Sequence, residues 1–260
     1  AISAETASKR PARPSGQNTC QAKNSARFRI TPTTAAVMAV SGAVNFRSPC
    51  VDSTSGAPAS VAAIMDCPVI NAGDGTHEHP TQALLDAFTL RERLFGKAIG
   101  KGLDGVNVAV VGDIAHSRVA RSNLILLKTL GANVHLIAPP TLLPKGLASK
   151  AVSAYNNFDT AIEDQSFDAV MMLRIQSERM QAAFFPSESE YSKLWGLNRE
   201  RYQRMGKETL IMHPGPMNRG LEIDSFCADH PNSTVLDQVR NGVSARMAVL
   251  YHLAGTERNA

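Results

Sequence analysis

Aromatic residues are scarce in this sequence, and it contains no dense run of basic residues. Only 5% of the 260 residues are aromatic, with a single Trp. Lys and Arg are scattered along the chain, although the net charge is +4 and the pI is about 9.0. Nucleic-acid surfaces use clustered cations and aromatic rings for base stacking. We therefore expect an ordinary protein surface and no nucleic-acid partner.

Cysteines are few, and long apolar runs are missing. The four cysteines are Cys20, Cys50, Cys67 and Cys227; none forms a C-x-x-C pair or has His at zinc spacing, so free thiols in a reducing compartment are expected. No apolar run approaches the roughly 20 residues that span a bilayer, and no signal-peptide pattern occurs. These absences predict a cytoplasmic protein without a membrane partner.

The first thirty residues differ in composition from the rest. They are rich in Ala, Ser, Arg, Lys and Pro, and Glu5 is the only acidic residue before Asp52. A basic, acid-poor targeting segment is one interpretation. A disordered or non-native leader over residues 1–32 is the other, and we favour it.

From residue 33 onwards, short apolar runs alternate with helical patterns, which predicts an α/β fold. The runs are continuously apolar, as in strands buried on both faces of a parallel sheet. The expected strands are Ala43–Phe46, Pro68–Ile70, Val106–Val111, Val134–Ala138, Ala169–Leu173 and Leu210–Met212.

Three helices are predicted between and after these strands. One begins at Pro80, a residue suited to the first helical position, and another ends at Gly131. A last helix is expected over Ser244–Leu253. The first two helices have apolar faces with 4-3-4 spacing, formed by Ala83, Ala87, Leu90 and Leu94 and by Ala120, Leu124, Leu127 and Gly131.

Polar side chains follow the strand runs repeatedly. They are Arg47, His79, Arg118, Arg174 and His213. Because the carboxyl ends of parallel strands form the ligand crevice, we expect all five on one side of the molecule. Arginine grips carboxylate or phosphate in a bidentate way. A single arginine would most simply be a solvated surface cation, but three at strand ends predict a crevice for small, highly anionic substrates.

Several common catalytic signatures are missing. Gly112 does not belong to a G-x-G-x-x-G motif, and the sequence has no phosphate-binding P-loop, no G-x-S-x-G elbow and no H-E-x-x-H motif. His77-Glu78-His79 resembles a metal site only superficially, because a third and a fourth ligand with suitable context are lacking. We expect neither a metal nor another cofactor.

Four segments together resemble the aspartate carbamoyltransferase family. They are His79–Asp86, Gly112–Asn123, Leu173–Arg179 and His213–Gly220, in the family's order, and the resemblance covers residues 40–256. It implies a transferase of de novo pyrimidine biosynthesis that moves the carbamoyl group of carbamoyl phosphate to L-aspartate, giving N-carbamoyl-L-aspartate and phosphate.

The resemblance also implies roles for residues that bind carbamoyl phosphate. Arg47 resembles the arginine that holds the phosphate and the carbonyl group, and His79 resembles the histidine that hydrogen-bonds the carbonyl oxygen. These two are the expected catalytic residues. Gln82 resembles the glutamine that contacts the carbamoyl NH₂ group. Gly215 and Pro216 resemble the loop whose backbone meets carbamoyl phosphate.

For aspartate, the resemblance implies that Arg118 and Arg174 grip the two carboxylates, supported by Gln176. It implies two α/β domains with parallel sheets flanked by helices: a carbamoyl-phosphate domain over 33–97 plus 236–260, and an aspartate domain over 98–235. It further implies a homotrimer, with regulatory or dihydroorotase chains as possible additional partners.

One family element is missing from the sequence. The family's Ser-Thr-x-Thr-Arg phosphate-binding turn does not occur in residues 1–46, so we expect an incomplete first domain that binds aspartate-like dianions but transfers the carbamoyl group poorly. A non-catalytic structural subunit or a fragment is the alternative. A transcarbamoylase for ornithine is less favoured, because that family has Cys where this chain has Thr81, and because Arg174 demands a carboxylate.

Overall fold

The computed structural model describes residues 37–39, 56–65, 67–96, 102–175 and 187–255. The strand predicted at 43–46 lies outside these residues. So do two expected site residues, Arg47 and Gln176.

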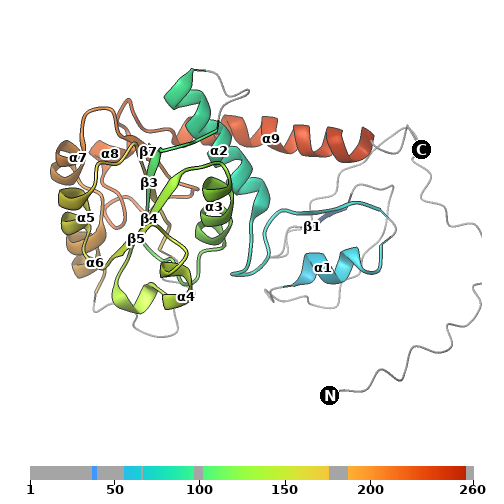
Figure 1. The fold of residues 1–260 in the computed structure, drawn as a ribbon, viewed down its shortest axis with the longest axis horizontal. Helices are drawn as coiled ribbons and strands as arrows, with labels where there is room; N and C mark the ends of the chain where they lie inside the picture. Colours follow the sequence, from blue (N-terminus) through green and yellow to red (C-terminus); the bar gives the residue numbers. More distant parts are fainter. Residues whose placement is uncertain (1–36, 40–55, 66, 97–101, 176–186, 256–260) are drawn as a thin grey trace, which may run out of the picture.

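A five-stranded, fully parallel sheet lies between two layers of helices (Figure 1). Its strands are β3 (Asn107–Val111), β4 (Asn133–Ile137), β5 (Ser153–Tyr155), β6 (Ala169–Met172) and β7 (Leu210–Met212). Their order is β5-β4-β3-β6-β7, so the direction of winding reverses between β3 and β6. In open sheets of this kind, the crevice outside that reversal is where ligands bind.

Helices cover both faces of the sheet (Figure 1). Alternate residues of β3 supply the two cores: Val108 and Val110 pack on one side, and Ala109 and Val111 pack on the other. The first face carries α2 (Pro80–Phe95), α3 (Arg118–Thr129), η1 (Pro140–Leu142) and α4 (Lys145–Ala148); the second carries α5 (Phe158–Asp164), α6 (Glu188–Trp195), α7 (Arg199–Met205) and α8 (Ser225–Ala228). The prediction of an α/β fold with a parallel sheet flanked by helices is confirmed.

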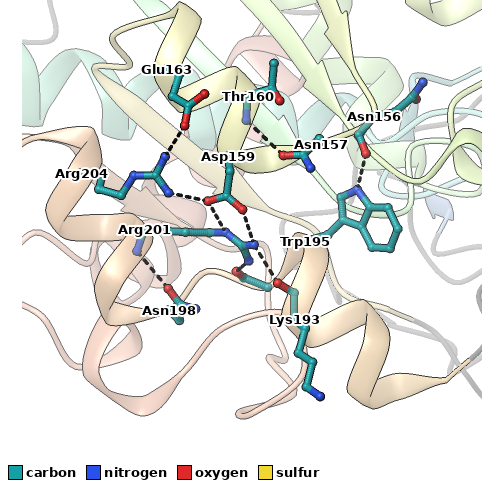
Figure 2. Close-up of polar contacts among 11 residues, drawn as sticks. Asn156, Asn157, Asp159, Thr160, Glu163, Lys193, Trp195, Asn198, Arg201 and Arg204 are labelled. Carbon is teal, nitrogen blue, oxygen red and sulfur yellow. Dashed lines mark hydrogen bonds and ion pairs between the residues drawn. The ribbon is translucent and has the colours of Figure 1, made fainter.

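A buried arginine ties the helices of the second face together (Figure 2). Arg201 of α7 donates to both carboxylate oxygens of Asp159 on α5, at 3.1 and 2.7 Å. Its other donors reach the backbone carbonyls of Lys193 and Gly196, each at 2.7 Å. The hydrogen bonds from Arg201 hold the pKa of Asp159 below its usual range. This arginine is therefore structural.

The two predicted interior helices are confirmed. Helix α2 begins at Pro80, and α3 begins at Arg118, where the Ser117 hydroxyl accepts a hydrogen bond from the backbone N–H of Ala120 at 3.1 Å. These starts place His79 and Arg118 at helix N-termini, where backbone N–H groups and the helix dipole favour anions.

The last helix, α9 (Val235–Gly255), begins well before the predicted Ser244. In the first half of α9, apolar side chains are exposed and amide side chains are buried, the reverse of the usual pattern. Leu236 and Val239 are 82% and 67% exposed, whereas Gln238 and Asn241 are only 3% exposed. Apolar periodicity cannot reveal a helix that buries amides, so the prediction of its start was wrong.

Helix α9 packs closely against α2. Gly242 permits this approach, because a Cβ atom there would lie 3.2 Å from Leu85 Cδ2 of α2. A short segment precedes α2: β1 (Val37–Ala39), α1 (Ala57–Ala62) and β2 (Val69–Asn71). Strand β2 matches the predicted run at 68–70, but it pairs antiparallel with β1, which differs from the parallel sheet expected there. None of the described helices combines the length and apolarity needed to span a bilayer.

Candidate active site

A cavity of about 260 Å³ lies at the carboxyl ends of β3 and β6, where the winding of the sheet reverses. Loops after β2, β3, β6 and β7 and the start of α3 contribute to it. Among the residues that line it are His79, Asp113, Arg118, Arg174, Gly215 and Pro216. The expectation that residues after successive strands meet on one side is thus met for His79, Arg118 and Arg174.

The position of Arg118 depends on a glycine in the loop after β2. Gly73 has φ +133°, and a Cβ atom built there would lie 2.8 Å from Arg118 Cζ and 2.9 Å from its Nη1. Only a residue without a side chain allows the guanidinium to lie against this backbone. The loop and the first residue of α3 are therefore fitted to each other.

Asp113 places an acid in a cavity otherwise rich in cations. Its carboxylate accepts hydrogen bonds from the backbone N–H of His116 at 3.0 Å. Asp113 Oδ1 also lies 2.9 Å from His116 Nδ1. Asp113 is 3% exposed. Its charge is thus engaged by its own loop, and it orients the His116 ring at the rim of the cavity.

His79 is neutral at neutral pH. Burial is the largest cause that lowers its pKa, the positive charges of Arg118 and Arg246 add to it, and together they bring the pKa from 6.5 to about 4. Its backbone N–H donates to Ser122 Oγ at 2.8 Å, which anchors the start of α2 to α3. A neutral imidazole can donate a hydrogen bond to a ligand oxygen without adding a second cation.

The loop after β7 separates the main cavity from a smaller one of about 180 Å³, because Pro214 and Gly215 line both. The smaller cavity is also lined by Gln82, His213 and Arg246. Gln82 and His213, which we expected beside the other site residues, therefore lie on the far side of this loop.

His213 and Glu222 shape that loop, and both are fully buried. The backbone N–H of Gly215 donates to His213 Nδ1 at 2.9 Å, so the ring proton is on Nε2, which lies 3.2 Å from Glu222 Oε1. Glu222 Oε1 also accepts from the backbone N–H of Asn218 at 2.5 Å. One carboxylate thus fixes both ends of the segment that carries Gly215 and Pro216.

Sequence reasoning missed Arg246. It lies on α9, away from any strand end, and reaches the smaller cavity only because α9 packs on α2. No hydrogen bond or ion pair of its guanidinium is found within the part of the chain that the structure describes. In the same segments, no group of three or more His, Cys, Asp or Glu side chains could hold a metal ion.

The fold and the site together define a class of protein, an α/β protein with a site for small polyanions. Its parallel sheet is doubly wound, and two arginines and a neutral histidine lie at the switch point of that sheet. Comparison with models of known protein families identifies one family within this class. Residues 104–253 match the model of the aspartate/ornithine carbamoyltransferase Asp/Orn binding domain. Residues 15–92 match the carbamoyl-P binding domain of the same family. The chain belongs to the aspartate/ornithine carbamoyltransferase family.

Relatives of known name support this assignment. The chain is 59% identical over 210 residues to the aspartate carbamoyltransferase catalytic subunit of Clavibacter sepedonicus, covering 80% of this chain and 66% of that one. The Leifsonia xyli subunit is 58% identical with the same coverage. The chain thus spans slightly less than two thirds of the length of these relatives.

Solved structures show the same likeness. The M. jannaschii catalytic subunit of aspartate transcarbamoylase has a TM-score of 0.61 and 33% identity, with 80% of this chain and 66% of that chain covered. The Trypanosoma cruzi aspartate transcarbamoylase in complex with carbamoyl phosphate has a TM-score of 0.64 and 27% identity, with coverage of 76% and 63%. The T. cruzi enzyme has also been solved with N-(phosphonacetyl)-L-aspartic acid (PALA).

Proposed function

We propose that this chain transfers the carbamoyl group of carbamoyl phosphate to L-aspartate, as part of pyrimidine biosynthesis. The observation that carries the proposal is the meeting of Arg118, Arg174 and a neutral His79 in one cavity at the switch point of the sheet. Relatives that bind carbamoyl phosphate and PALA have the same fold.

Aspartate brings two carboxylates, and the cavity offers two arginines. Each guanidinium can form a bidentate pair with one carboxylate, which fixes the substrate in place and in orientation. We assign this role to Arg118 and Arg174, with Gln176 supporting them. An ornithine side chain would instead bring an ammonium group towards Arg174, and like charges repel.

Carbamoyl phosphate would then bind where the two cavities meet, at Pro214 and Gly215, which line both. His79 donates to its carbonyl oxygen, Gln82 contacts its NH₂ group, and the backbone at Gly215 and Pro216 closes over it. Arg47 holds the phosphate and the carbonyl group. These roles make the carbonyl oxygen the point at which several donors converge.

The chemistry needs no protein nucleophile. The aspartate amine attacks the carbamoyl carbon, a C–N bond forms, and negative charge develops on the carbonyl oxygen, where His79 and Arg47 stabilise it. The C–O bond to phosphate then breaks, and the leaving phosphate accepts the amine proton. Holding two anions together in reactive geometry supplies the rest of the acceleration.

We further infer the organisation of the chain. Residues 33–97 and 236–260 belong to the carbamoyl-phosphate domain, and residues 98–235 form the aspartate domain. The active species is a cytoplasmic homotrimer, open to regulatory or dihydroorotase partner chains. Light scattering of the purified chain tests the trimer: a mass three times that of the chain supports it, and a monomer at working concentration refutes it.

Product formation is the direct test of the activity. The purified 260-residue chain is incubated with carbamoyl phosphate and either L-aspartate or L-ornithine, and the carbamoylated product is measured. The proposal is supported if the wild-type chain and the control Arg204→Met, on the surface of α7, form N-carbamoyl-L-aspartate and Arg174→Met does not. Product from ornithine alone, or none from either amine, contradicts it.

A further inference from the structure

We propose that Asp86 is a positioning residue that turns the Gln82 amide so that its oxygen faces the smaller cavity, which makes this site select a ligand carrying an NH₂ group. The proposal rests on the proposed function, because it concerns the carbamoyl end of that site. Asp86 lies on α2 and is fully buried.

Three side-chain amides surround this carboxylate, each from a different helix or turn. Asp86 Oδ1 accepts from Gln82 Nε2 at 3.0 Å and from Gln238 Nε2 of α9 at 2.8 Å. Asp86 Oδ2 accepts from Asn123 Nδ2 of α3 at 2.8 Å. One acid therefore joins α2, α3 and α9 behind the site.

Two of the three amides are oriented independently of Asp86. Gln238 Oε1 accepts a hydrogen bond from the backbone N–H of His213 at 3.0 Å. A backbone N–H can only donate, so the Gln238 atom that faces Asp86 must be the NH₂ nitrogen. Asn123 Nδ2 also donates to the carbonyl of Val119 at 3.1 Å, a group that can only accept. Both oxygens of Asp86 thus face obligatory donors and must be acceptors.

These contacts fix the orientation of the Gln82 amide. Only its NH₂ end can face an acceptor, so its Oε1 is directed to the other side, and Gln82 lines the smaller cavity. Within the described residues, Gln82 Oε1 has no hydrogen-bond partner. Burial raises the pKa of Asp86 to about 6, although the three amides oppose the rise. The group is therefore still an ionised acceptor at neutral pH.

A Gln82 Oε1 that faces the smaller cavity favours a ligand that can donate a hydrogen bond to it. The NH₂ group of carbamoyl phosphate can pair with Gln82 Oε1. The methyl group of acetyl phosphate, which has the same shape, leaves that oxygen unpaired and desolvated. Sites that hydrogen-bond a polar group discriminate strongly against analogues lacking it. We expect a preference of at least about tenfold for carbamoyl phosphate over acetyl phosphate.

The orientation is testable in the wild-type protein. Solvent exchange of the Gln82 side-chain NH₂ protons, measured by ¹⁵N NMR and assigned by loss of the signal in Gln82→Met, is compared with that of Gln203, which is exposed on α7. We expect exchange at least about tenfold slower at Gln82, because its NH₂ is hydrogen-bonded in the interior. Equal rates overturn the proposal, and this readout needs no ligand.

Selectivity is tested with a variant. Asp86→Ala removes both acceptors and leaves the Gln82 amide able to turn; Asp164→Ala, at an exposed position of α5, is the matched control. Calorimetry with carbamoyl phosphate and acetyl phosphate should show the preference reduced to within about threefold of unity in Asp86→Ala and retained in the control. A purely structural role would weaken both ligands equally, and an unchanged ratio overturns the proposal.

The failure of the proposed function is distinguishable from the failure of this inference. If the wild-type chain binds neither phosphate, the carbamoyl-phosphate assignment is refuted, while the NH₂ exchange rate still decides whether Asp86 orients Gln82. If Asp86→Ala does not fold, the same wild-type exchange measurement decides.

Discussion

Replacing His79 by glutamine should change how the free energy of unfolding depends on pH. Burial and the charges of Arg118 and Arg246 lower the pKa of His79 from 6.5 to about 4 in the folded chain. A group whose pKa is depressed by folding contributes stability that is present above its unfolded pKa, here 6.5, and is lost as the pH falls through 4. A fall from 6.5 to about 4 corresponds to about 3 kcal/mol.

Asp86 has the opposite effect in the same pH window. Burial raises its pKa from 3.8 to about 6, so its contribution is present below pH 3.8 and is lost as the pH rises through 6. This contribution is also about 3 kcal/mol. In the wild-type chain the two contributions oppose each other between pH 4 and pH 6, which hides both.

His79→Gln removes only the histidine contribution. We expect the unfolding free energy of the wild type, relative to that of the variant, to rise by about 3 kcal/mol from pH 4 to pH 7. Urea unfolding can be followed by fluorescence of Trp195, the chain's single tryptophan, which is 8% exposed. His252→Gln on the exposed side of α9 gives the baseline. A pH-independent difference would refute the low pKa of His79.

Two further predictions follow from the packing around the site and away from it. Gly73→Ala places a Cβ atom 2.8 Å from Arg118 Cζ and should displace that guanidinium. We expect L-aspartate binding to weaken about tenfold while carbamoyl phosphate binding changes little. Equal loss of affinity for both ligands in calorimetry would contradict this. Arg201→Met leaves the backbone carbonyls of Lys193 and Gly196 without this donor and leaves Asp159 paired with Arg204 alone. It should lower the unfolding free energy by about 3 kcal/mol with ligand affinity unchanged. Urea unfolding with no loss would contradict this.

The central sheet could be predicted because its strands are buried on both faces. Val106–Val111 and Ala169–Leu173 are continuous apolar runs, and their burial makes the pattern unambiguous. Strand β5 was missed because Ser153–Tyr155 is a half-exposed edge strand of three residues. The start of α9 was missed because that helix buries Gln238 and Asn241 and exposes its apolar residues.

The same contrast holds for the site. The meeting of Arg118 and Arg174 in one cavity could be predicted because both follow strands of one parallel sheet, and the topology brings strand ends together. The roles of Asp86 and Arg246 could not be predicted in this way. Asp86 meets Gln238 from 152 residues further along the chain, and Arg246 reaches the smaller cavity from a helix with no strand-end signal. Contacts of that range depend on how α9 packs on α2, which no local pattern encodes.

The central claim is that Arg118 and Arg174 grip a dicarboxylate beside the carbamoyl end of the site. The most direct test is calorimetric binding of PALA, which joins a phosphonate to aspartate in one molecule, to the wild-type chain and to Arg118→Met, Arg174→Met and the control Arg204→Met. We expect binding by the wild type and the control, and affinity at least about tenfold weaker in each of the other two variants. Absence of binding by the wild-type chain, or equal affinity in all four proteins, would contradict the claim.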